Sequence, residues 1–110
     1  VQIARAIMTD PEILLLDEPA ASLDLGAREE LLQLLSAYAS SADAPAIVMV
    51  THHVEEIPAG FTHALLLAEG RVAAAGPLAE VLTADRLSAA FGLALEVTEE
   101  EGRFTARAAR

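Results

Sequence analysis

The chain has 110 residues, 54% of them hydrophobic, which suits one modest domain and argues against disorder. It contains no cysteine, which excludes disulfides and zinc–thiolate sites, and no apolar run approaches the roughly 20 residues that cross a bilayer. The formal net charge of −10 argues against a nucleic-acid-binding surface, because phosphate contacts need clustered cations.

The first segment, residues 1–8, has the apolar spacing of a helix, with Arg5 off its apolar face as a packing or surface residue. Pro11 ends this helix because proline disfavours helical geometry in the residue before it. The helical pattern is already under way at Val1, which is not an initiator Met. We therefore expect the chain to be part of a longer protein.

A strand, a helix and a second strand follow. Residues 13–16 are a purely apolar run, which predicts a strand buried on both faces, as in a parallel sheet covered by helices. Asp24 suits the N-cap of a helix that runs to Ala39, and residues 46–50 are a second apolar strand. Together they predict a right-handed βαβ unit. The helix turns an apolar stripe inward, formed by Leu31, Leu34, Leu35 and Tyr38.

The remaining elements are shorter. Residues 54–57 suit a short helix, and residues 63–68 and 71–75 suit a hairpin around Glu69-Gly70. Pro77 can open a helix that ends at Leu82.

Two elements complete the chain. Thr83 can cap a helix that has Leu87, Ala90 and Phe91 inward and stops at Gly92. Residues 93–98 and 103–107 predict a final hairpin around the acidic turn 99–102.

The most informative stretch is Ile13-Leu-Leu-Leu-Asp-Glu-Pro19, where two carboxylates follow a buried strand. Ligands of parallel α/β sheets bind at this end of the strands. Asp17 can therefore lie near Mg²⁺, and Glu18 can orient and deprotonate an attacking water. The alternative is a strand that ends in a turn with two solvated acids, and this stretch by itself does not exclude it.

Four motifs in order add to this stretch. They are "VQIARAI" at the N-terminus, "ILLLDEP" (13–19), "SLD" (22–24) and "VTHH" (50–53). In this order and spacing they resemble the C-terminal half of an ATP-binding cassette (ABC) ATPase: the helix after the signature, the Walker B strand, the D-loop and the switch histidine. The resemblance continues through residues 65–82 and covers residues 1 to about 91.

The resemblance implies a role for each matching residue. Asp17 matches the Walker B aspartate, which acts on Mg²⁺, often through water. Glu18 matches the catalytic glutamate, and His52 matches the switch histidine that contacts the γ-phosphate of ATP. Ser22 and Asp24 match the D-loop, which couples two ATPase subunits across the bound nucleotide.

Other candidates receive no such role. His53 reads as a helix-start residue, and His63 as a structural or solvated residue at a strand start.

Ala20 and Ala21 replace residues common in the family, and both changes look tolerable. The larger departure is that the 110 residues contain no lysine, no phosphate-binding loop, no Q-loop and no complete signature. Phosphoryl transfer in this family depends on that loop and its lysine. We expect ATP hydrolysis by the intact protein and none by this chain alone.

The fold class implied is α/β: part of a P-loop NTPase core with parallel strands and helices, followed by β-hairpins and short helices. Residues 1–91 would belong to the nucleotide-binding domain, and residues 92–110 would be a hairpin tail of the same domain. The resemblance implies ATP and Mg²⁺ as cofactors. The implied partners are a transmembrane permease and a second ATPase copy, with the protein on the cytoplasmic face of the cell membrane and without nucleic acid.

Three functions stay open at this point. The first is the ATPase subunit of an ABC transporter, and residues 76–92 resemble importers of the iron-chelate and metal-uptake type. The second is a non-transport ABC ATPase of DNA repair or translation, against which the net charge of −10 speaks. The third is a non-enzymatic α/β interaction domain.

Overall fold

The computed structural model describes residues 13–109, so the helix predicted over residues 1–8, with Arg5, lies outside the described residues. The described chain forms two compact units that divide between Gly60 and Phe61. The boundary predicted after residue 91 falls within the second unit. Among residues 13–109, no helix is both long enough and apolar enough to cross a membrane.

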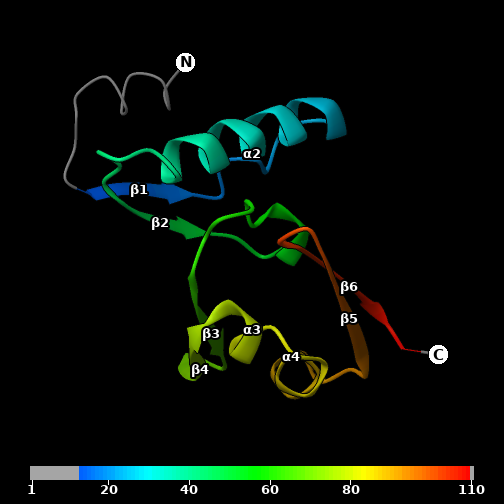
Figure 1. The fold of residues 1–110 in the computed structure, drawn as a ribbon. Coiled ribbons are helices and arrows are strands. Elements are labelled where there is room, and N and C mark those ends of the chain that lie inside the picture. Colours follow the sequence, from blue (N-terminus) through cyan, green and yellow to red (C-terminus); the bar gives the residue numbers. More distant parts are fainter. Residues whose placement is uncertain (1–12, 110) are drawn as a thin grey trace. The chain divides into compact units, whose positions relative to one another are not determined.

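The first unit is built on a strand–helix–strand arrangement. Strands β1 (Ile13–Asp17) and β2 (Ala46–Val50) pair in parallel, with Asp17 opposite Val50. Helix α2 (Leu25–Ala39) connects them and lies along one face of the sheet, as Figure 1 shows. The predicted parallel βαβ unit is therefore confirmed.

Helix α2 begins at the predicted N-cap. The Asp24 carboxylate accepts a hydrogen bond from the backbone N–H of Ala27 at 2.8 Å, which satisfies one of the free donors of the first turn. Leu35 is fully buried against the sheet, as predicted, but Leu34 is 50% exposed and Leu32 takes an inward position. The stripe prediction was wrong at Leu34. Residues 32 and 35 are one helical turn apart, so they share the buried side of the helix, and Leu34 lies outside that side.

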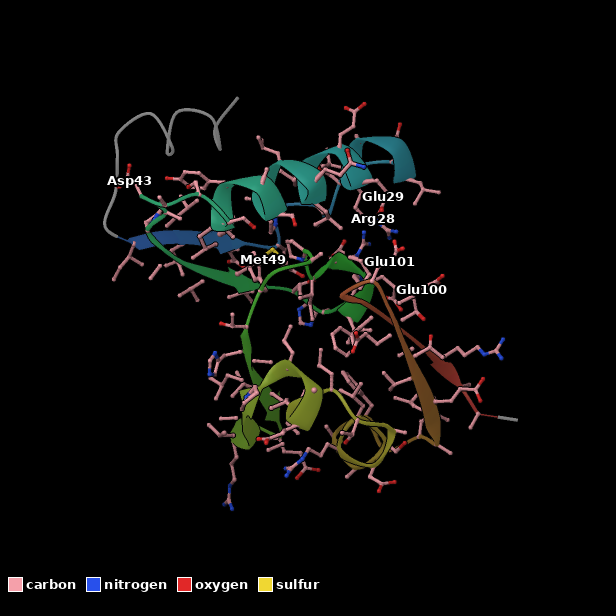
Figure 2. The ribbon with its side chains drawn as sticks, in the orientation of Figure 1. Arg28, Glu29, Asp43, Met49, Glu100 and Glu101 are labelled. Atoms are coloured by element: carbon pink, nitrogen blue, oxygen red, sulfur yellow. The ribbon has the colours of Figure 1, made fainter. Side chains whose placement is uncertain are left out.

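The two faces of the β1–β2 sheet differ sharply. Leu14 and Leu16 are buried and form a core with Leu35 of α2. Around this core pack Leu31, Tyr38, Ile47 and Met49, the last of which is labelled in Figure 2. Side chains alternate along a strand, so the other residues of both strands point to the opposite face. That face is exposed at Ile13 (64%), Leu15 (69%), Val48 (49%) and Val50 (47%). The prediction that β1 is buried on both faces was wrong for this chain.

The second unit begins with a hairpin. Strands β3 (His63–Ala68) and β4 (Arg71–Pro77) pair antiparallel around Glu69-Gly70, as predicted. Both turn residues have positive φ, which tight two-residue hairpin turns require. Strand β4 continues to Pro77, which caps the short helix α3 (Leu78–Val81) rather than opening it as a helical residue.

Helix α4 (Ala84–Phe91) is capped by Thr83 and stops at Gly92, which has a positive φ, as predicted. Leu87 is buried at 1% exposure, but Phe91 is 58% exposed and was wrongly predicted to point inward.

Strands β5 (Leu95–Glu100) and β6 (Arg103–Ala108) form the last hairpin. Its turn is Glu101-Gly102, two residues shorter than predicted, because both residues adopt positive φ and close a two-residue turn.

We predict that the uncovered sheet face makes the isolated chain self-associate or aggregate, because four large apolar side chains meet water there. Size-exclusion chromatography with light scattering measures the association. Replacing Leu15 and Val48 by lysine should give a monomer, since charge on an open strand opposes association. Placing two lysines elsewhere, at the exposed Gln33 and Ala79, gives the control for charge without removing a large apolar side chain. A soluble monomeric wild-type chain with a sharp cooperative melt would contradict the prediction.

Candidate functional site

Two carboxylates lie where β1 ends. Asp17 is the last residue of the strand, and Glu18 is the first residue beyond it. Asp17 is exposed, and its place in the strand alternation puts it on the face that α2 does not cover. Both residues therefore lie at the carboxyl edge of the parallel pair, as the sequence predicts.

Glu18 has an unusual backbone conformation. Its φ is 47°, in the left-handed region that residues other than glycine rarely adopt, at a cost of about 1–2 kcal/mol. Its backbone N–H donates to the carbonyl of Val50 at 2.8 Å, which ties it to the end of the neighbouring strand. Strain of this kind persists where the surrounding structure holds it, and it is frequent at functional sites.

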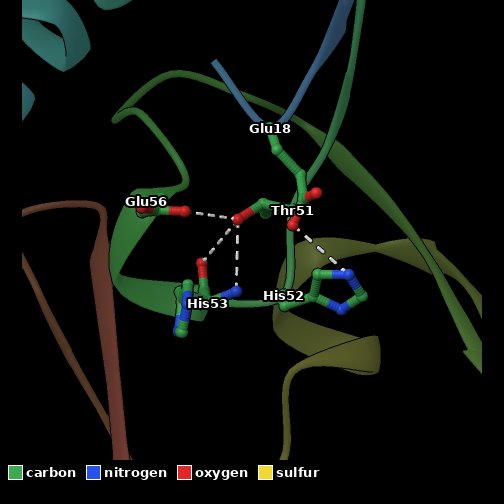
Figure 3. Close-up of polar contacts among 5 residues, drawn as sticks. All are labelled: Glu18, Thr51, His52, His53 and Glu56. Atoms are coloured by element: carbon green, nitrogen blue, oxygen red, sulfur yellow. Dashed lines mark hydrogen bonds and ion pairs between the residues drawn. The ribbon is translucent and has the colours of Figure 1, made fainter. Parts of the chain in front are cut away.

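His52 is the second residue after β2 and reaches the same edge. Its Nε2 lies 3.3 Å from Oε1 of Glu18, and Figure 3 shows the two side chains turned toward each other. The side chains are 76% and 42% exposed, so water screens the pair and its contribution to stability is small. The contact is informative because of its geometry. It shows that an imidazole and a carboxylate, each from the segment after one of the two strands, lie side by side.

A second cluster supports the turn that carries His52. The hydroxyl of Thr51 lies 2.6 Å from Oε1 of Glu56 and accepts a hydrogen bond from the backbone N–H of His53 at 3.1 Å. Glu56 ends the short 3-10 helix η1 (Val54–Glu56), which replaces the predicted helix 54–57. Its exposure is only 7%, which is low for a carboxylate.

Sequence reasoning missed Thr51 and Glu56 as a pair. A glutamate among other acidic residues, Glu55 being its neighbour, reads as solvated in the sequence. It is buried where the short helix brings it within hydrogen-bond distance of Thr51, five residues earlier. No capping pattern in the sequence has this spacing, so no local signal could have identified the contact.

The two residues predicted for the D-loop lie in the connection to α2. Two successive turns shape this loop, with Ala21 N–H donating to Glu18 O and Leu23 N–H to Ala20 O. Ser22 is exposed, and Asp24 caps α2 through Oδ1. Ala20, which stands at a position the family often fills differently, is 3% exposed and packs inside.

The two remaining histidines lie outside the contact of Glu18 with His52. His53 is the N-cap residue of η1, and its side chain makes no capping hydrogen bond. His63 begins β3, and its Nδ1 lies 2.9 Å from the hydroxyl of Thr62 in an exposed position. Both places agree with the structural roles expected from the sequence.

A magnesium ion fits the donor set only in part. Within residues 13–109, no group of three or more His, Cys, Asp or Glu side chains could hold a metal ion by itself. Mg²⁺ in nucleotide sites commonly keeps several waters and takes one or two carboxylates, with phosphate oxygens as further ligands. The exposed carboxylate of Asp17 suits that kind of site, in which a nucleotide completes the ligand set.

Comparisons with known proteins identify the relatives of the chain. It is 48% identical over 101 residues to the uncharacterized ABC transporter ATP-binding protein YlmA of Bacillus subtilis, which covers 92% of this chain and 38% of YlmA. It is 45% identical over 82 residues to the molybdenum import ATP-binding protein ModC of Aromatoleum aromaticum, covering 74% of this chain and 22% of ModC. The chain thus spans less than two-fifths of the length of these curated relatives.

A solved structure agrees with the sequence relatives. An ABC transporter assigned to the metal-chelate type, in an inward-facing conformation, matches 96% of this chain and 42% of its own with a TM-score of 0.76 and 29% identity. No protein-family model matches the sequence. The resemblance read from the four motifs is confirmed by these relatives.

The positive φ of Glu18 predicts that glycine is more stable than alanine at this position. Both substitutions remove the carboxylate and its contact with His52, so their difference isolates the backbone strain. We expect Glu18→Gly to exceed Glu18→Ala by about 1 kcal/mol in free energy of unfolding. Urea unfolding followed by circular dichroism, in the background of the two lysines at Leu15 and Val48, measures it. Equal stability of the two variants would show that residue 18 is not held in the left-handed region.

Proposed function

The chain is homologous to ABC transporter ATP-binding proteins, and we therefore propose that it is part of the ATP-binding subunit of such a transporter. In this function, ATP hydrolysis is coupled to the transport of a solute across the membrane. The observation that carries the proposal is the contact between Glu18 and His52 at the carboxyl edge of two parallel strands.

Glu18 acts in this proposal on the attacking water. Its carboxylate is partly exposed, so a water can reach it, and a positioned carboxylate can polarise that water as a general base. The hydrogen bond from its own N–H to Val50 fixes the backbone at this residue. A fixed backbone limits where the carboxylate can lie, which supports a role that depends on position.

His52 contacts the γ-phosphate in this proposal, with Glu18 beside it. An imidazole N–H can donate to a phosphate oxygen in either charge state. Asp17, on the open face of the same sheet edge, would be the residue that holds Mg²⁺ through water. Bound Mg²⁺ would neutralise charge that develops on the phosphate oxygens.

The phosphates must be held by residues beyond this chain. The lysine that binds the phosphates in such ATPases cannot come from these 110 residues, because they contain no lysine. Since positioning supplies most of the catalysis of phosphoryl transfer, we propose that the chain by itself does not turn over ATP. The parallel strands and α2 would then belong to a P-loop NTPase core, with residues 1–91 in the nucleotide-binding domain and residues 92–110 as its tail.

The proposal also includes the assembly. A second ATPase copy would face the loop that contains Ser22 and Asp24, and a transmembrane permease would hold the pair at the inner face of the cell membrane. The segment 76–92 and the similarity to a metal-chelate type transporter support an importer of metal-containing solutes. The match to a molybdenum import protein agrees with that class.

The two other functions have less support. A non-transport ABC ATPase would share the same motifs, but the relatives described above are transporter proteins. A non-enzymatic interaction domain would need no contact between a glutamate and a histidine at the sheet edge. This alternative therefore does not explain why Glu18 and His52 meet there.

A chimera tests the proposal, with this chain in place of the matching segment of Bacillus subtilis YlmA. We predict Mg²⁺-dependent ATP hydrolysis, which Glu18→Gln lowers at least about 100-fold in kcat, because a general base typically contributes that much. The KM for ATP should change little, since the amide keeps the shape of the side chain.

Glu69→Gln is the matched control, because Glu69 is also a glutamate with a positive φ and lies in a hairpin turn of the other unit. Its kcat should equal that of the parent chimera. Normal hydrolysis by Glu18→Gln would refute the assignment of the base. Absence of any Mg²⁺-dependent hydrolysis by the parent chimera would favour the non-enzymatic alternative.

A further inference from the structure

The feature to explain is the burial of Glu56. Its exposure is 7%, and it is the one buried charged residue in the part of the chain that the structure describes. Burying a carboxylate is unfavourable unless hydrogen bonds replace the lost water. A solvated glutamate at this position would avoid that cost, so the buried position needs a compensating contact.

The contact is with Thr51. The hydroxyl of Thr51 donates to Oε1 of Glu56 at 2.6 Å, which is much closer than its other acceptor, the carbonyl of His53 at 3.5 Å. The hydroxyl oxygen then accepts from the N–H of His53 at 3.1 Å. The carbonyl of His53 in turn accepts from the N–H of Glu56 at 3.0 Å, which closes a ring of hydrogen bonds around the turn.

His52 lies between the two residues that this ring fixes. Figure 3 shows Thr51, His53 and Glu56 joined on one side of the turn, while the His52 side chain points to Glu18 on the other. With its neighbours on both sides held, the backbone of His52 has little freedom. The held backbone limits the positions that the exposed imidazole can take beside Glu18.

We infer that Glu56 is a positioning residue, which through the hydroxyl of Thr51 fixes the turn that presents His52 to Glu18. This inference rests on the proposed function, because it concerns the histidine that the proposal places at the phosphate. It assigns Glu56 a place in the reaction without contact to nucleotide or water. Thr51 is the link, and its hydroxyl rather than its methyl group carries the effect.

Substitutions in the YlmA chimera test the inference. Glu56→Ala and Thr51→Val each remove one end of the contact, and each should lower kcat about tenfold or more at a nearly unchanged KM for ATP, since small misplacements have effects of this size. The double variant should be no slower than the single variants, because both act through one contact. Glu56→Gln and Thr51→Ser keep an acceptor and a hydroxyl, and both should restore at least half of kcat.

Glu55→Ala is the matched control, because it removes the same charge from the neighbouring residue of η1 and should leave kcat within about twofold. An equal loss in Glu55→Ala would overturn the inference in favour of a general effect of charge. A loss in Glu56→Ala that glutamine does not restore, with a matching fall in Tm, would overturn it in favour of a purely structural role.

A second readout separates this inference from the proposed function. NMR of the ¹⁵N-histidine-labelled chimera reports the surroundings of His52, with His52→Gln to assign its signals. We expect Glu56→Ala and Thr51→Val to shift the ring signals of His52, and Glu55→Ala to leave them unchanged. If His52→Gln leaves kcat unchanged, the catalytic role of His52 fails, yet shifted signals would still establish the positioning. Unshifted signals together with a normal kcat in Glu56→Ala would refute it.

Discussion

The parallel pairing of β1 with β2 is the constraint on which the site depends. Leu14, Leu16 and Leu35 hold α2 against one face of the pair, which fixes the register of the two strands. A shift of one residue would turn the buried leucines toward water, so the register is strongly determined. With Asp17 opposite Val50, the two chain segments that leave the sheet start side by side. The contact of Glu18 with His52 follows from packing that occurs on the other side of the sheet.

The elements that were predicted correctly are those with a local cause. Asp24 and Thr83 bond to the helix that each begins, and Gly92 ends α4 with a backbone conformation that glycine tolerates. The hairpin at Glu69-Gly70 has a turn that two residues determine. The meeting of Asp17, Glu18 and His52 at one edge was also predictable, because parallel strands bring their carboxyl ends together. Their chemical roles rest on the resemblance and stay predictions.

The features that were missed depend on what packs against them. The inward side of α2 differs from the expected stripe at Leu34, because periodicity alone leaves the helix free to rotate by a fraction of a turn. Phe91 was predicted to point inward, yet at the end of α4 its side chain is mostly exposed. Glu56 is the clearest case: it is buried and bonded to Thr51, and neither composition nor periodicity predicts that contact.

The open face of the β1–β2 sheet has an electrostatic consequence for Asp17. This carboxylate lies on the same face as Leu15, in contact with water as the chain stands. Any protein surface laid over that face would replace high-dielectric water beside the carboxylate with a medium of much lower permittivity. Coulombic attraction to a cation strengthens as permittivity falls, while an unpaired anion becomes costlier to keep. A cation beside Asp17 would therefore offset part of the cost of covering the apolar strands, since it would pair the carboxylate that the cover desolvates.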